Sequence, residues 1–208
     1  MKRTFIIIVF FLLASFQSLR AQESKELKSG KIGIFSSYGV NEVFRFEELI
    51  GAASYNGDNF FTGGISYALN MNKWLEIETG LEYAKHKFYI IPNVPPYIDV
   101  MPEEESFEII SVPVNVKANF LKFFYINAGA IIDIDVSQNS LIDRQTGLGS
   151  VMGIGIKYDF DFGGSVFINP YTKVHTLIPF VEEDFQQRVW ETGLRIGVTY
   201  DLGQMGRP

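Results

Sequence analysis

Apolar and polar residues alternate one by one along much of the chain. In the segment 74–88, apolar residues occupy every second position, and Glu76, Glu78, Glu82 and His86 lie among the positions between them. Because the side chains of a strand point alternately to its two faces, this pattern predicts a strand with one apolar and one polar face. Four ionisable groups on one face cannot line a dry apolar core at acceptable cost.

The same alternation recurs along the chain and predicts eight strands. They are residues 31–40, 60–71, 74–88, 108–120, 124–136, 147–160, 165–174 and 189–202. The connectors alternate in length, with long ones at 41–59, 88–106, 136–146 and 175–187. Short turns at one end and longer loops at the other are typical of transmembrane β-barrels, and an even strand number puts both termini on the periplasmic side.

Two prolines lie inside predicted strands. Pro113 and Pro170 each lack the N–H group that a ladder hydrogen bond requires. A β-bulge would accommodate either proline.

Alternation alone does not say which face points outward. A soluble lipocalin-type barrel is apolar inside, whereas a membrane barrel is apolar outside. The polar faces are rich in glycine, which suits a crowded lumen, and the apolar faces end in aromatic residues, as the two interface girdles of a membrane barrel do. The sequence therefore favours an all-β fold, an eight-stranded antiparallel up-and-down transmembrane β-barrel. A soluble lipocalin-like binder of apolar ligands stays as an alternative.

The polar faces carry charges of both signs. An eight-stranded barrel has an interior just wide enough for side chains to fill, so these charges are expected to pair within the lumen as a structural network. The expected members are Glu76, Glu78, Glu82, Lys117, Asp133, Asp135, Lys157, Lys173, Glu191 and Arg195. This predicts a plugged lumen with little conductance, and a narrow solute channel is the alternative.

The N-terminus has the layout of a secretory signal peptide. Lys2 and Arg3 precede an apolar run at 5–13, and Ala21 marks the expected cleavage position. The run is shorter than the about 20 residues that a spanning helix needs. We expect residues 1–21 to be the signal peptide and 22–208 to be the barrel domain.

Composition excludes several kinds of chemistry. The chain has no cysteine, so disulfides, thiolate metal sites and a cysteine nucleophile are excluded. Its net charge of −6 argues against nucleic acid, because phosphate binding needs a basic face. The two histidines, His86 and His175, are expected at the outer rim, and no residue spacing around them supports a catalytic triad. We therefore expect no enzyme activity, no metal site and no cofactor.

Two features of the long loops bear on partners. Acidic runs at 103–105 and 182–184 match no calcium-binding loop and are expected to be solvated loop charges. The proline-rich segment 91–97 stiffens the second long loop, and its apolar character indicates packing on a partner or on the barrel mouth.

Several motifs resemble one known family. The stretch 110–117, with Pro113 and Lys117, is followed by Phe-Tyr-Ile-Asn-Ala-Gly-Ala at 124–130, and glycine-rich strands follow at 147–155 and 193–197. This combination resembles the PorT-like outer-membrane β-barrel proteins of Bacteroidetes. The resemblance implies an eight-stranded barrel in the cell outer membrane and no particular activity.

Together these patterns predict a monomeric barrel in outer-membrane lipid with periplasmic termini. Its role would be structural or would depend on interactions of its four outer loops, including contact with an envelope protein.

Overall fold

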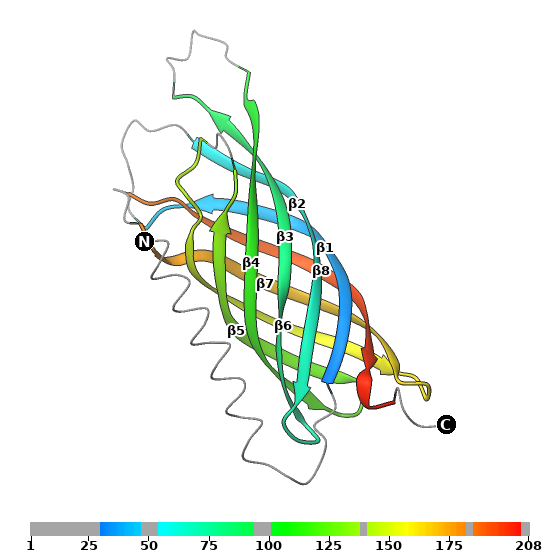
Figure 1. Ribbon diagram of the computed structural model, residues 1–208. Coiled ribbons are helices and arrows are strands. Elements are labelled where there is room, and N and C mark those ends of the chain that lie inside the picture. Colours follow the sequence, from blue (N-terminus) through cyan, green and yellow to red (C-terminus); the bar gives the residue numbers. More distant parts are fainter. Residues whose placement is uncertain (1–29, 47–53, 94–100, 138–140, 182–184, 205–208) are drawn as a thin grey trace.

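Eight antiparallel strands close into a single ring, in which each strand pairs with the next and β8 pairs with β1 (Figure 1). The strands are β1 (Gly30–Phe44), β2 (Ser54–Asn70), β3 (Leu75–Ile91), β4 (Glu103–Phe120), β5 (Phe124–Asp135), β6 (Gly147–Asp159), β7 (Gly164–Pro179) and β8 (Arg188–Asp201), followed by a short 3-10 helix, η1 (Leu202–Gln204). This computed structural model describes residues 30–46, 54–93, 101–137, 141–181 and 185–204. The predicted signal peptide and the acidic run 182–184 lie outside the described residues.

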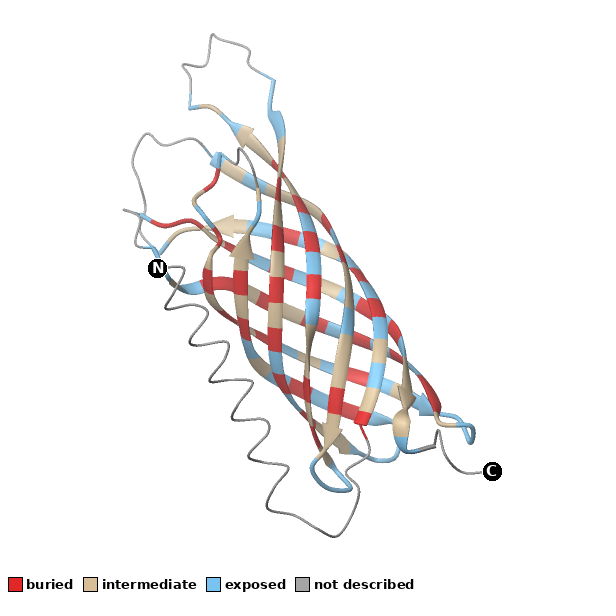
Figure 2. Ribbon diagram, viewed as in Figure 1, coloured by how far each residue is buried: buried red, intermediate tan, exposed pale blue. Residues whose placement is uncertain are grey.

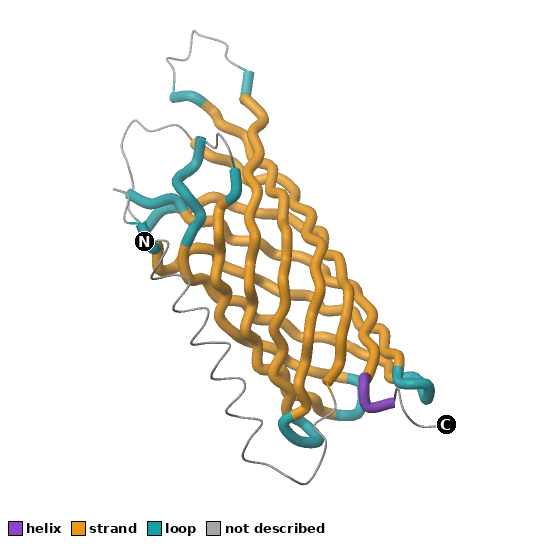
Figure 3. The backbone as a smooth tube through the Cα atoms, viewed as in Figure 1, coloured by secondary structure: helices purple, strands orange, loops and turns teal. Residues whose placement is uncertain are grey.

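The eight predicted strands are confirmed, with the long connectors at one end of the barrel and the short turns at the other (Figure 3). We call these the long-loop end and the short-turn end. Several strands extend further toward the long-loop end than predicted, since β2 begins at Ser54 and β4 begins at Glu103. The acidic run 103–105 is therefore part of a strand and not of a loop. Within the described residues, no helix is long and apolar enough to cross a membrane.

The extra residues form a three-stranded extension beyond the closed ring. The pairing of β1 with β2 ends at Val40 and Asn59, and the pairing of β4 with β5 begins only at Ile109 and Asp135. Beyond these points, β2 and β4 still pair with β3, as far as Ser54 and Glu103. Figure 1 shows this extension projecting from the long-loop end.

The two faces of the barrel wall differ in polarity as a membrane barrel requires, with apolar side chains outside and charged side chains inside. Buried and exposed residues alternate along every strand, with charged groups such as Glu82 and Lys173 at buried positions (Figure 2). Large apolar side chains face outward, including Ile34 at 62% exposure and Ile65 at 58%. The polar face therefore lines the lumen, and the alternative of a lipocalin-like barrel with an apolar interior is wrong.

The two strand prolines are accommodated without a bulge. Pro113 keeps its pairing with Ile131 of β5, and Pro170 keeps its pairing with Leu194 of β8. On the other side of each proline the ladder is interrupted and then resumes in the same register. A proline lacks only one donor, so one neighbouring strand loses a bond while the other is unaffected. Neither proline lies at a bulge, and the register shifts are at Gly57/Phe60 and Leu148/Ser150.

Apolar side chains also occupy the lumen, which the alternation did not predict. They form three layers from the short-turn end to the long-loop end: Phe35, Tyr125 and Phe167; then Phe60, Ile131, Val151 and Tyr171; then Phe88, Phe107, Ile109, Ile142 and Val189. The glycines of the polar faces make room for these rings, because a Cβ at Gly155 would overlap the ring of Tyr125. The interior is thus filled by alternating charged and aromatic layers.

Candidate functional site

The lumen is the place where the ionisable side chains of the chain converge. Near the short-turn end, the Glu76 carboxylate lies 3.0 Å from Lys31 Nζ and 3.5 Å from Lys157 Nζ. One layer further in, Lys117 Nζ donates to Glu78 at 2.6 Å. Each carboxylate therefore meets a cation from a different strand.

The middle of the lumen holds a four-membered charge cluster. Glu82 accepts from Lys173 Nζ and from Arg195 Nη2, each at 2.8 Å. Lys173 Nζ also lies 3.0 Å from Glu191 Oε1, and the guanidinium of Arg195 lies over the ring of Tyr171. All four charged side chains are at most 5% exposed, so two carboxylates and two cations balance one another away from solvent.

A second polar cluster lies toward the long-loop end. His86 Nε2 lies 2.8 Å from Glu191 Oε2, and His175 Nδ1 lies 2.9 Å from Asp133 Oδ2. His175 Nε2 is 3.3 Å from the same Glu191 Oε2. The prediction of two rim histidines is wrong, because both rings are fully buried inside the lumen. The sequence did contain a signal for this burial. In the alternating pattern, His86 lies on the same strand face as Glu82, and His175 lies on the same strand face as Lys173.

One predicted member has a different role. Asp135 is half-buried and forms no ion pair within the described part of the chain. Its two carboxylate oxygens accept the backbone N–H groups of Ser137 and Gln145. The side chain therefore holds the connector between β5 and β6. The prediction grouped it with the lumen charges because the alternation continues to the end of β5, where the lumen gives way to the loop.

The long connectors close the lumen above the histidines. Buried Gln145 donates through Nε2 to the backbone oxygens of Asp143 and Gln187, and the Gln187 N–H donates to Asp143 Oδ2. These bonds tie the β5–β6 connector to the β7–β8 connector. They lie next to the apolar layer that contains Ile142 and Val189.

Little free space is left near the short-turn end of the lumen. The cavity bounded by Lys31, Glu76 and Lys117 has a volume of about 20 Å³. This is about the space that one water molecule occupies.

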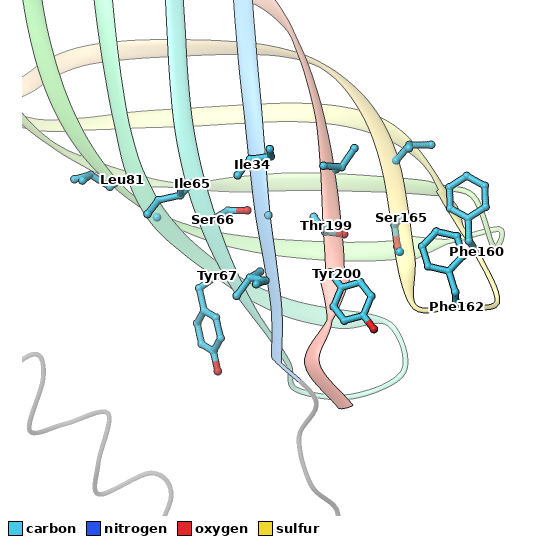
Figure 4. Close-up of a pocket in the computed structure, with 16 residues that line it drawn as sticks. Ile34, Ile65, Ser66, Tyr67, Leu81, Phe160, Phe162, Ser165, Thr199 and Tyr200 are labelled. Atoms are coloured by element: carbon cyan, nitrogen blue, oxygen red, sulfur yellow. The ribbon is translucent and has the colours of Figure 1, made fainter. Parts of the chain in front are cut away.

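The outer wall carries a larger apolar hollow near the short-turn end (Figure 4). Its volume is about 730 Å³, and Ile34, Ile65 and Leu81 are among the residues that line it. Figure 4 shows the rings of Tyr67 and Tyr200 at the end of this hollow that is nearest to the short turns. Ser66, Ser165 and Thr199 line both this hollow and the small lumen cavity.

Two solved structures share this fold. The outer membrane protein OprG from Pseudomonas aeruginosa is 11% identical, with a TM-score of 0.51 over 84% of this chain and 97% of that chain. The outer membrane protein AlkL, solved in DMPC bilayers, is 12% identical, with a TM-score of 0.52 over 87% of this chain and 93% of that chain. The fold is therefore that of eight-stranded outer-membrane barrels.

No family model and no curated protein matches the chain. The resemblance to PorT-like barrels thus stays a prediction that depends on the quoted motifs.

Proposed function

We propose that the protein is an integral barrel of the bacterial outer membrane, closed by its own side chains, with a structural or interaction role carried by its outer loops. The observation that supports this most directly is the inverted distribution of residues. Apolar side chains cover the outside of all eight strands, and charged side chains are buried within. A soluble monomer rarely exposes an apolar patch larger than a few hundred Å², and here the apolar surface surrounds the barrel.

Aromatic residues mark where this surface would meet the two membrane interfaces. Trp74, Phe124 and Tyr158 are exposed near the short turns, and Trp190 is exposed near the start of β8 at the other end. Amphipathic rings at both ends of an apolar belt are the usual anchors of a membrane barrel.

The orientation follows from loop length. In this arrangement the short turns and both termini face the periplasm, and the long connectors face outward. The three-stranded extension of β2, β3 and β4 then stands above the outer surface. The extension itself would face an envelope protein or the exterior, and residues 94–97 of the predicted proline-rich loop lie outside the described residues.

Solute transport through a narrow channel is the second candidate function. Its support is the charged layer at the short-turn end, where Lys31, Glu76 and Lys157 border the 20 Å³ cavity. Against it stand the three apolar layers and the buried ion pairs, which occupy the lumen from the short-turn end to the long-loop end. We therefore assign no channel, enzyme or cofactor function, and propose a monomer.

Cell fractionation tests the location. We expect the protein in the outer-membrane fraction and a different gel mobility before and after boiling, since a closed barrel resists detergent until it is heated. Recovery of folded protein in the soluble periplasmic fraction would contradict the membrane assignment.

Planar-bilayer recording separates the plugged barrel from the channel. We expect no stepwise conductance from the purified folded protein. Steady current steps whose ion selectivity changes in a Glu78→Gln variant would favour the channel, because Glu78 and Lys117 form a buried ion pair inside the lumen.

A further inference from the structure

Three metal-ligating atoms converge inside the lumen, away from solvent. They come from His86 on β3, His175 on β7 and Glu191 on β8, and one ligand atom of each lies within 4.8 Å of the others. Glu191 Oε2 is 2.8 Å from His86 Nε2 and 3.3 Å from His175 Nε2. Each ligand comes from a different strand of the closed ring, so the backbone holds the three in place. The rings of His86 and His175 are 5.3 Å apart and nearly perpendicular, at 81°.

We propose that His86, His175 and Glu191 bind one divalent transition-metal ion, with Zn²⁺ as the best match. Two imidazoles and one carboxylate form a familiar zinc donor set. Zinc bonds of about 2.0–2.2 Å in a tetrahedral site put neighbouring ligand atoms roughly 3.3–3.6 Å apart. The two His–Glu separations of 2.8 and 3.3 Å need only a small widening to reach that range.

The hydrogen bonds of His175 point to a cation between these atoms. A carboxylate only accepts, so the bond from Nδ1 to Asp133 places a proton on Nδ1. In the neutral ring, Nε2 then carries a lone pair, and it makes no hydrogen bond although it is buried. Nε2 lies 3.3 Å from Glu191 Oε2. Two electron-rich atoms this close in a dry lumen repel each other unless a metal ion or a proton offsets their negative charge.

The charge count of the surrounding groups leads to the same requirement. Lys173 and Arg195 are balanced by Glu82 and Glu191, with which they form ion pairs. Asp133 meets no lysine or arginine in the described part of the chain. With neutral histidines, the cluster carries one uncompensated negative charge, which favours a cation; a divalent ion changes the net charge of the cluster from −1 to +1.

The groups that hydrogen-bond to His175 and Glu191 are arranged as in established metal sites. Asp133 orients His175 through Nδ1 and in turn accepts from the hydroxyl of Ser111. The other oxygen of Glu191, Oε1, accepts from Tyr171 and faces Lys173, which leaves Oε2 for the two histidines. Such second partners fix the tautomer and orientation of metal ligands.

His86 is oriented by stacking. Its ring lies parallel to that of Phe107, with 4.7 Å between centroids and 5° between planes. The ring of Phe60 stacks on it at 5.4 Å. The aromatic layers therefore hold the imidazole in the plane that points Nε2 at Glu191.

The test uses the untagged full-length barrel, refolded into detergent micelles with Co²⁺ or Zn²⁺ present, because a plugged lumen gives a metal no path after closure. We expect one metal ion per chain after desalting, and a visible Co²⁺ absorption band that is lost when Zn²⁺ competes with Co²⁺ during refolding. Zinc X-ray absorption of the wild-type protein should show two imidazole ligands, a readout that needs no variant.

Variants assign the ligands. Glu191→Gln and His175→Gln should each lose the bound metal, whereas Glu76→Gln, a buried lumen carboxylate outside the site, should retain it. Asp133→Asn keeps all three ligands and should weaken binding by about 10–100-fold. The heat-dependent gel shift checks that each variant has folded, independently of metal.

Folded wild-type protein that binds neither Co²⁺ nor Zn²⁺ would overturn the proposal and assign the positive species to a proton on His175. Equal metal content in the wild type and in folded Glu191→Gln would also overturn it, since the ion would then lie elsewhere.

Discussion

Glu82 is the residue whose replacement tests the lumen charge network most directly. Its side chain is 1% exposed and accepts from Lys173 and Arg195 at 2.8 Å each. We predict that Glu82→Gln, which keeps the volume and removes the charge, destabilises the folded barrel. Removing one partner of a buried ion pair typically costs about 3–5 kcal/mol, because the remaining charge is left uncompensated.

The neighbours of Glu82 place the destabilisation caused by Glu82→Gln at the lower end of this range of about 3–5 kcal/mol. Lys173 keeps a second carboxylate, Glu191, at 3.0 Å. Arg195 loses its ion-pair partner and keeps the hydroxyl of Ser37 at 3.4 Å and the ring of Phe35 at 4.3 Å. One cation, and not two, is therefore left without a counter-charge. A loss of about 3 kcal/mol lowers the folding equilibrium constant by roughly a hundredfold.

The assay is urea unfolding in micelles, followed by the fluorescence of Trp74 and Trp190 and by gel mobility. Glu104→Gln is the matched control, because its pair with Lys87 at 2.7 Å is exposed and should leave the unfolding midpoint nearly unchanged. The double variant Glu82→Gln with Arg195→Met removes both charges and should recover part of the loss. The reasoning is refuted if Glu82→Gln unfolds at the same urea concentration as Glu104→Gln.

Three further predictions concern the wall and the lumen. Ile196 is 52% exposed on β8 between Trp190 and Tyr200. In a bilayer, Ile196→Arg should therefore lower the folding stability by about 2–4 kcal/mol, whereas Ile196→Leu should leave it unchanged. Equal stability of the two variants would contradict a lipid-facing wall. Gly129→Val should abolish the heat-dependent gel shift, because a Cβ there overlaps the carbonyl oxygen of Val114, while Gly63→Ala has open space and should fold normally. The wild-type barrel should show no conductance steps, and a current in folded wild-type protein would mean that the paired charges leave a path.

The strands and their two faces could be predicted because they depend on a local pattern. A strand between lipid and a charged lumen repeats every two residues, and segment 74–88 shows this without knowledge of its neighbours. The pattern weakens where both faces carry apolar residues. Phe88 and Phe107 point into the lumen at its long-loop end, and there the predicted limits of β3 and β4 were too short.

The partners of each charge could not be predicted, because they depend on the register around the ring. Glu82 and Arg195 are 113 positions apart, and Lys31 and Glu76 are 45 apart. The histidine cluster was missed for the same reason. His86, His175 and Glu191 share no sequence spacing, and only the closure of β8 onto β1 fixes their common depth in the lumen.

The three-stranded extension has a consequence for how the protein meets its neighbours. Within the ring every strand edge is paired, but among the described residues the part of β4 from Glu103 to Phe107 has no strand partner on the β5 side. An unpaired edge is a template on which another chain can add a strand. Here three consecutive glutamates, at 103–105, occupy it, so like charges would repel a second copy that approached edge to edge. The acidic run thus disfavours edge-to-edge pairing between neighbouring barrels.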